Sequence, residues 1–211
     1  MRNIRLSVLV VCFFIPFLCV FGQEAQQYQM LTLAFYNLEN LFDTENDPIT
    51  YDDDRTPHGK DRWTQEIYTD KLAKMAEVIA QIGPEEAQGP PAILGVAEIE
   101  NLKVLQELTG QEVLRSAHYG IVHYDSPDRR GIDVGLLYNT QVFQVISSKV
   151  FELELYNTER EDKRIYTRDQ LLVTGNLAGE RMHVIVNHWP SRSGGEARTR
   201  PRRMAAAALN K

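Results

Sequence analysis

Three β-rich runs in the sequence are each followed by a polar side chain that can take part in metal or acid–base chemistry. Asn37, Glu98 and His188 follow these runs, which cover residues 30–36, 92–97 and 182–187. Because side chains alternate along a strand, a polar residue at its end can share the buried face and still reach the open edge. Carboxylate and amide oxygens suit Mg²⁺ or Mn²⁺, and an imidazole can stabilise or protonate a leaving oxygen. The pattern predicts a site for a hard metal ion and a phosphate.

Each of these residues also has a purely structural interpretation. Asn37 is of a type that caps turns and helices, and His188 could be a hydrogen-bonded structural histidine, although Pro190 and Ser191 indicate a tight loop after it. A carboxylate at Glu98 would be costly to bury without a partner. The coincidence of all three residues favours a functional site.

A further candidate group lies in the turn before the β-rich run 134–138. Arg130 can clamp a phosphate with two hydrogen bonds, and Asp133 can orient a neighbouring group. A surface turn with an ordinary ion pair is the alternative. Beyond Ser191 the chain has only Glu196 against a set of basic residues: Arg192, Arg198, Arg200, Arg202, Arg203 and Lys211. Such local basicity can steer a polyanion, but a solvated helix face is the commoner explanation.

The order of predicted elements indicates layered α/β structure. Apolar residues recur at helical spacing from Tyr68 to Ile82, and Gly83 with Pro84 ends that helix. A short helix is expected over 102–108 and another over 198–211, with the remaining runs β-rich: 119–124, 134–138, 142–151, 171–177 and 182–187. The acidic stretch 43–61 is expected to be a solvated loop, because its acids lack the regular alternation of a calcium-binding loop. Packed sheets covered by helices follow from this order.

Composition narrows the class of protein. The chain has 211 residues, a formal net charge of −6, 43% hydrophobic and 25% charged residues. These values exclude a collagen-like, disordered or disulfide-scaffold protein, and the length suits one domain with a real core.

The amino terminus reads as a secretory signal peptide over residues 1–22. Two arginines precede an apolar run over 6–21 that is short for a membrane span and contains Pro16. A retained membrane anchor is the alternative. We expect a secreted or periplasmic protein, a monomer without stable membrane insertion. Cleavage after Gly22 would remove both cysteines, Cys12 and Cys19, which excludes cysteine-bound zinc and a cysteine nucleophile.

Four motifs resemble those of the endonuclease/exonuclease/phosphatase superfamily, which includes DNase I-like nucleases. They are FYNLEN at 35–40, ILGVAEIEN at 93–101, RGIDVGLLY at 130–138 and NHWPSRSGG at 187–195. The resemblance implies a four-layer α/β/β/α sandwich that hydrolyses phosphoester bonds with Mg²⁺, or with Mn²⁺ or Ca²⁺. Substrates would be nucleic acids or other phosphodiesters.

The resemblance also implies roles for individual residues. Glu98 is similar to the family's metal-binding glutamate and Asn37 to the asparagine of its first motif. His188 is similar to the histidine that contacts the scissile phosphate, and Arg130 resembles a phosphate contact that Asp133 would support.

One departure from the family pattern shapes the expected function. Members normally continue past the helix at 197–211 to a Gly-Asp-x-Asn motif and a closing Asp-His pair, which this sequence lacks. We therefore expect residues 23–211 to form the amino-terminal portion of the domain, incomplete on its C-terminal side. The predicted function is an exported metal-dependent phosphodiester hydrolase, specifically a nuclease. The alternatives are a phosphatase or phosphodiesterase of lipid or sugar phosphates, and an inactive remnant that binds polyanions.

Overall fold

The computed structural model describes residues 29–87, 89–157 and 163–211. The predicted signal peptide lies outside the described residues. Within these ranges, no helix combines the length and apolar composition that a membrane span requires.

The first sheet has four strands in the order β1-β2-β4-β3. Their bounds are Leu33–Leu41 for β1, Ile93–Ile99 for β2, Tyr119–His123 for β3 and Asp133–Asn139 for β4. β1 and β2 are parallel, and the other pairs are antiparallel. A parallel pair requires a crossover connection, and the helix between β1 and β2 provides it.

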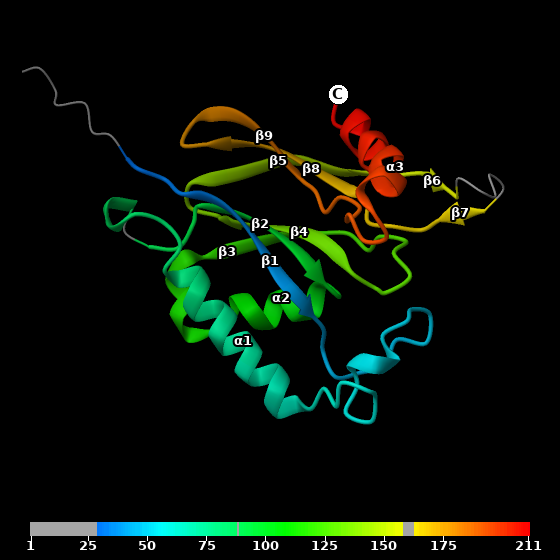
Figure 1. The fold of residues 1–211 in the computed structure, drawn as a ribbon. Coiled ribbons are helices and arrows are strands. Elements are labelled where there is room, and N and C mark those ends of the chain that lie inside the picture. The colour runs from blue at the N-terminus through cyan, green and yellow to red at the C-terminus, as the bar shows by residue number, and fades with distance from the viewer. Residues whose placement is uncertain (1–28, 88, 158–162) are drawn as a thin grey trace, which may run out of the picture.

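Two helices cover the outer face of this sheet (Figure 1). They are α1 at Gln65–Ala80 and α2 at Leu102–Thr109. Thr64 and Asn101 cap their first turns, each side chain accepting a backbone N–H three residues on. The predicted apolar face of α1 is confirmed, with Tyr68 among its buried residues. Short 3₁₀ turns lie at Asp53–Arg55, Glu85–Ala87 and Glu112–Ala117.

A second, antiparallel sheet packs against the inner face of the first. Its order is β5-β8-β9, with bounds Phe143–Phe151, Gln170–Leu177 and Glu180–Val186. Apolar side chains from both sheets fill the space between them: Ala92, Ile93, Ala97, Val134, Leu136, Phe143, Leu171, Val173, Leu177 and Val186. Burial of these apolar side chains holds the two sheets together.

The outer face of the second sheet carries α3, at Glu196–Leu209 (Figure 1). Gln170 Nε2 donates to the carbonyl of Ala206 over 2.7 Å, which ties the helix to β8. α3 also packs on a small hairpin, β6 at Leu155–Tyr156 and β7 at Arg164–Ile165. That hairpin was not predicted, because two residues per strand give no periodicity. The α/β/β/α layers expected from the sequence are confirmed.

The path of β1 differs from the prediction in one respect. The face of the run 30–36 that Asn37 shares was expected to be buried, but Leu33 and Phe35 on this face are 49% and 53% exposed. β1 lies at the edge of its sheet, so the second sheet leaves part of its inner face uncovered.

Candidate active site

Glu98 stands on a bulge inside β2 rather than after the strand. β2 pairs with β4 through Ala97 to Val134 and through Ile99 to Asp133, so Glu98 is an extra residue without a partner. Its φ of 59° lies in the left-handed region, which a residue with a side chain adopts at a cost. Bulges of this kind bend a strand and re-aim a side chain.

The bulge decides which face of the sheet receives the carboxylate. Leu94 and Val96 pack against the helices, so regular alternation would send Glu98 to the same buried side. Instead, Glu98 Oε1 lies 3.3 Å from His188 Nε2, on the chain that follows β9 of the other sheet. The two side chains are 18% and 21% exposed. The sequence predicted that these residues would meet, and the structure brings them together by a backbone irregularity that alternation did not foresee.

Asn37 lies on the strand beside this bulge, in register with Ala97 of β2. β1 was expected to end there, but it continues to Leu41 through two left-handed residues, Glu39 and Asn40, at φ 52° and 58°. Asn37 Oδ1 accepts the N–H of Glu39 over 2.8 Å, an Asx turn within the strand. The turn-capping interpretation of Asn37 is therefore confirmed, and its role in a metal site stays a prediction.

Lys71 of α1 holds the irregular end of β1 in place. Its Nζ donates to the carbonyl oxygens of Glu39 and Asn40 over 2.5 and 3.2 Å, and lies 5.5 Å from the Trp63 ring centre. Burial lowers the pKa of Lys71 to about 8, although the charges of Glu39 and Glu98 act in the opposite direction. The helix thus fixes the backbone next to Asn37.

The surroundings of the His188 imidazole favour its neutral form. Burial lowers the pKa of its imidazole, the charge of Arg168 lowers it further, and the charge of Glu98 raises it. Nε2 of His188 faces Glu98 Oε1, whereas Nδ1 is buried and has no hydrogen-bond partner among the described residues.

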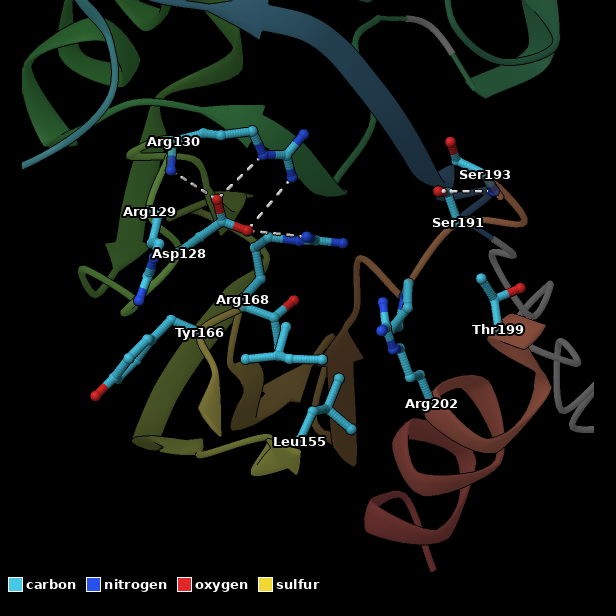
Figure 2. A pocket seen from close by; sticks show the side chains of 13 residues that line it. Asp128, Arg129, Arg130, Leu155, Tyr166, Arg168, Ser191, Ser193, Thr199 and Arg202 are labelled. Atoms are coloured by element: carbon cyan, nitrogen blue, oxygen red, sulfur yellow. Dashed lines mark hydrogen bonds and ion pairs between the residues drawn. The ribbon is translucent and has the colours of Figure 1, made fainter. Parts of the chain in front are cut away.

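A buried ion pair of Asp128 and Arg168 positions the His188 loop (Figure 2). Arg168 Nη1 donates to Asp128 Oδ2 over 2.9 Å, and Arg168 Nη2 donates to the carbonyls of His188 and Trp189 over 2.7 and 3.2 Å. Neither residue was predicted from the sequence. Arg168 stands just before the apolar strand β8, and a cation buried there requires a partner. This position in the sequence is the feature from which its role could have been predicted.

Arg130 joins the same network through Asp128. Its backbone N–H and Nε donate to Asp128 Oδ1 over 2.9 and 3.2 Å, and Nη2 donates to Oδ2 over 3.3 Å. Burial raises the pKa of Asp128, but the hydrogen bonds from Arg130 and Arg168 outweigh it, and the net shift is downward. The carboxylate therefore stays ionised and orients both guanidinium groups.

Asp133 is not the partner of Arg130. It is buried, and its carboxylate accepts from Ser126 N and Oγ over 2.8 and 2.6 Å and lies 3.0 Å from His123 Nε2. On β4 it shares the face of Leu137, which packs toward the helices. Ligand atoms of His123, Asp125 and Asp133 lie within 4.8 Å of one another, close enough to form a possible cation site.

The donors around Glu98 fit a hard divalent ion. Glu98 offers a carboxylate at the surface of the site, and Asn37 offers an amide oxygen whose hydrogen bond to Glu39 leaves one lone pair. No cysteine lies in the described residues, so coordination of a metal ion by thiolate is excluded there.

Comparison with known proteins gives the family. The model of the endonuclease/exonuclease/phosphatase family matches residues 32–211. No curated protein matches the chain.

Several solved structures have a similar fold at low sequence identity. Humanized D. rerio TDP2 is 12% identical, with a TM-score of 0.48 over 84% of this chain and 55% of that one. An endonuclease/exonuclease/phosphatase from Bacteroides vulgatus is 16% identical, with a TM-score of 0.48 over 84% and 57%. The human nocturnin catalytic domain is 19% identical, with a TM-score of 0.42 over 66% and 50%. The chain spans about half the length of these structures. By the match over residues 32–211, the chain belongs to the endonuclease/exonuclease/phosphatase family.

Proposed function

We propose that this protein is a metal-dependent phosphodiester hydrolase that acts on nucleic acid. The observation that carries the proposal is the contact between Glu98 and His188, which places a carboxylate from one sheet 3.3 Å from an imidazole of the other. Carboxylate and imidazole are the groups needed to hold a metal ion and to move a proton at a leaving oxygen. Family membership supports the same reaction class.

Glu98 and Asn37 would hold the metal ion, and Mg²⁺ or Mn²⁺ suits their oxygen donors. A divalent ion bound there supplies charge neutralisation at the phosphate and makes bound water more acidic. The left-handed backbone at Glu98 fixes the direction of the carboxylate before any ligand binds.

His188 and Arg130 would act directly on the phosphate group. The Nε2 proton of His188 can be donated to a phosphate oxygen or to the leaving oxygen. Arg130, whose side chain is 53% exposed, keeps donors available while Asp128 restrains its direction. Arg168 and Asp128 position both groups without needing to touch the phosphate.

The first experiment measures hydrolysis of plasmid DNA, RNA, sphingomyelin and inositol phosphates by purified protein with Mg²⁺ or Mn²⁺. We expect release of nucleotides, loss of activity with EDTA, and restoration on re-addition of metal. Glu98→Gln should reduce the rate at least about 100-fold, since it removes the ligand charge. Glu85→Gln is the matched control, because Glu85 lies exposed on a distant 3₁₀ turn.

Three other results of this experiment would contradict the proposed function. Hydrolysis that resists EDTA would refute metal dependence, and cleavage of sphingomyelin or inositol phosphates alone would make the protein a lipid or sugar phosphoesterase. Nucleic-acid binding without any hydrolysis would make it a polyanion-binding protein.

We also propose that the protein is exported, on the strength of the apolar run that follows two arginines at the amino terminus. Amino-terminal sequencing of protein from the medium or periplasm should begin at Gln23. A product that retains Met1 in the membrane fraction would contradict this.

A further inference from the structure

A pocket rich in arginine lies beside the candidate active site and shares Asp128, Arg130 and Arg168 with it. Its volume is about 390 Å³, and loops from both sheets and the start of α3 line it (Figure 2). Such a volume accommodates a phosphate together with part of a nucleotide.

The pocket is strongly positive in an acidic protein. Arg129, Arg130, Arg168 and Arg202 line it against one acid, Asp128, which gives a formal charge of +3 where the whole chain carries −6. Arg130 and Arg168 share the Asp128 carboxylate, so one acid is divided between two cations. Clustered cations repel one another, and a bound anion would relieve that repulsion.

Two of the guanidinium groups have donors without a partner. Arg168 is only 7% exposed, and its Nε has no hydrogen-bond partner within the described residues. The same holds for Nε of Arg202, whose side chain also forms no ion pair in the part of the chain that the structure describes. In Figure 2 the side chains of Arg168 and Arg202 extend into the pocket from the β8 side and from α3. Buried donors without acceptors are rare in native proteins, and both residues also line a cavity large enough for a ligand.

Arg168, like Arg130 and Asp128, belongs both to this pocket and to the candidate active site. Arg168 lines the pocket and also donates to the His188 carbonyl over 2.7 Å. An anion at Arg168 and Arg202 would therefore bind next to the scissile phosphate on which His188 would act. A substrate with adjacent phosphates can occupy both places at once.

The pocket also has an apolar and aromatic wall. Leu155, Ile165 and Tyr166 line it. Tyr166 is 41% exposed, and its ring centre lies 5.4 Å from the guanidinium carbon of Arg129 and 4.9 Å from that of Arg164. An exposed aromatic ring is a surface on which a sugar or base can pack.

We propose that this arginine pocket binds a second phosphate of the substrate, adjacent to the scissile one, so that the enzyme acts on substrates with at least two phosphates. This inference rests on the proposed hydrolase function and deepens it. The ligand chemistry is a phosphate with an attached sugar, supplied by the next nucleotide of a strand or by a sugar bisphosphate. The basic stretch after Ser191, which the sequence left between polyanion steering and a solvated face, thus contributes Arg202 to a defined site.

The first test is direct binding without turnover. Calorimetry in EDTA measures the affinity for a 5′-phosphorylated trithymidylate and for glucose 1,6-bisphosphate. Arg202→Gln should weaken binding about tenfold, and Arg202→Lys by less, because it keeps the charge but loses the planar fork. The slope of log K against log salt should fall by about 0.7 for the trinucleotide with Arg202→Gln. Arg200→Gln is the matched control, since Arg200 is exposed on the same helix and does not line the pocket.

The second test compares substrates with one and several phosphates. The kcat/KM ratio of trithymidylate to bis(p-nitrophenyl) phosphate should fall about tenfold with Arg202→Gln, through KM, and stay constant with Arg200→Gln. Unchanged trithymidylate affinity in Arg202→Gln, or equal losses on both substrates, would overturn the second-phosphate site. Stronger binding of glucose 1,6-bisphosphate than of trithymidylate would assign the site to sugar bisphosphates. If no substrate is hydrolysed, the proposed function fails, and the binding test still decides the pocket.

Discussion

Nε2 of His188 lies 3.3 Å from Oε1 of Glu98, although Glu98 stands on β2 of the first sheet and His188 follows β9 of the second. The contact exists because Glu98 occupies a left-handed bulge that turns its carboxylate away from the helices. The chain therefore accepts local backbone strain at the residue expected to hold a metal ion. Strain of this kind is characteristic of functional sites.

Replacing Glu98 with glycine should increase stability and abolish activity. Glycine adopts a φ of 59° without the steric cost that glutamate bears, so the free energy of unfolding should rise by about 1 kcal/mol. Urea denaturation measures this change, and DNA hydrolysis measures the loss. Ala178→Gly, at a φ of 48° in the turn between β8 and β9, is the control that should gain stability and keep activity. A Glu98→Gly protein less stable than wild type would show that the bulge carries no strain.

Removing either member of the Arg168–Asp128 pair should destabilise the fold. Arg168→Gln leaves a buried carboxylate with Arg130 as its remaining cation, and we expect a loss of about 2–3 kcal/mol. Asp128→Asn should cost a similar amount, and the double variant less than the sum of the two. A double-mutant cycle from denaturation curves measures this coupling, which should be at least about 1 kcal/mol. Strict additivity would mean that the pair does not act as a unit.

Lys71→Met should loosen the end of β1. The change removes two hydrogen bonds to the carbonyls of Glu39 and Asn40, with an expected loss of about 1–2 kcal/mol and a lower rate of hydrolysis. Lys74→Met is the matched control on the same helix, because its exposed ion pair with Asp70 contributes at most about 0.5 kcal/mol. Equal effects of the two variants on stability would contradict a positioning role for Lys71.

Asp169 should make stability fall between about pH 4 and pH 6. Burial raises the pKa of its carboxyl to about 6, with a smaller contribution from the charge of Glu152. Between the unfolded and folded pKa values the folded state binds more protons, so the free energy of unfolding decreases as pH rises and stays low above pH 6. Asp169→Asn should remove this dependence and be more stable than wild type at pH 7, by about 1–2 kcal/mol.

The measurement for Asp169 is a series of denaturation curves from pH 4 to pH 7 for both proteins. The difference between them should grow with pH over this range. A difference that stays constant would show that Asp169 is not the titrating group.

The elements of the fold were predictable from the sequence where periodicity was strong. The stripe from Tyr68 to Ile82 determined α1, and the β-rich runs determined the central strands, because a period of 3.6 or 2 reflects one buried face. The hairpin β6–β7 was not predictable, since it depends on packing against α3 rather than on its own residues. Exposure of Phe35 was also missed, because edge position is a property of the sheet and not of the strand.

By itself the sequence determined that Asn37, Glu98 and His188 stand near the ends of β-rich runs, since residue types and the alternation of apolar residues are local properties of the sequence. Only the tertiary structure decided that a bulge would turn Glu98 to His188, that Asp128 rather than Asp133 would hold Arg130, and that Arg168 and Arg202 would line one pocket. The physical reason is that hydrogen-bond partners and sheet register are chosen by competition among all segments that pack together. A local sequence pattern indicates which polar groups need hydrogen-bond partners when buried, and the packing of the whole chain determines which partners are available.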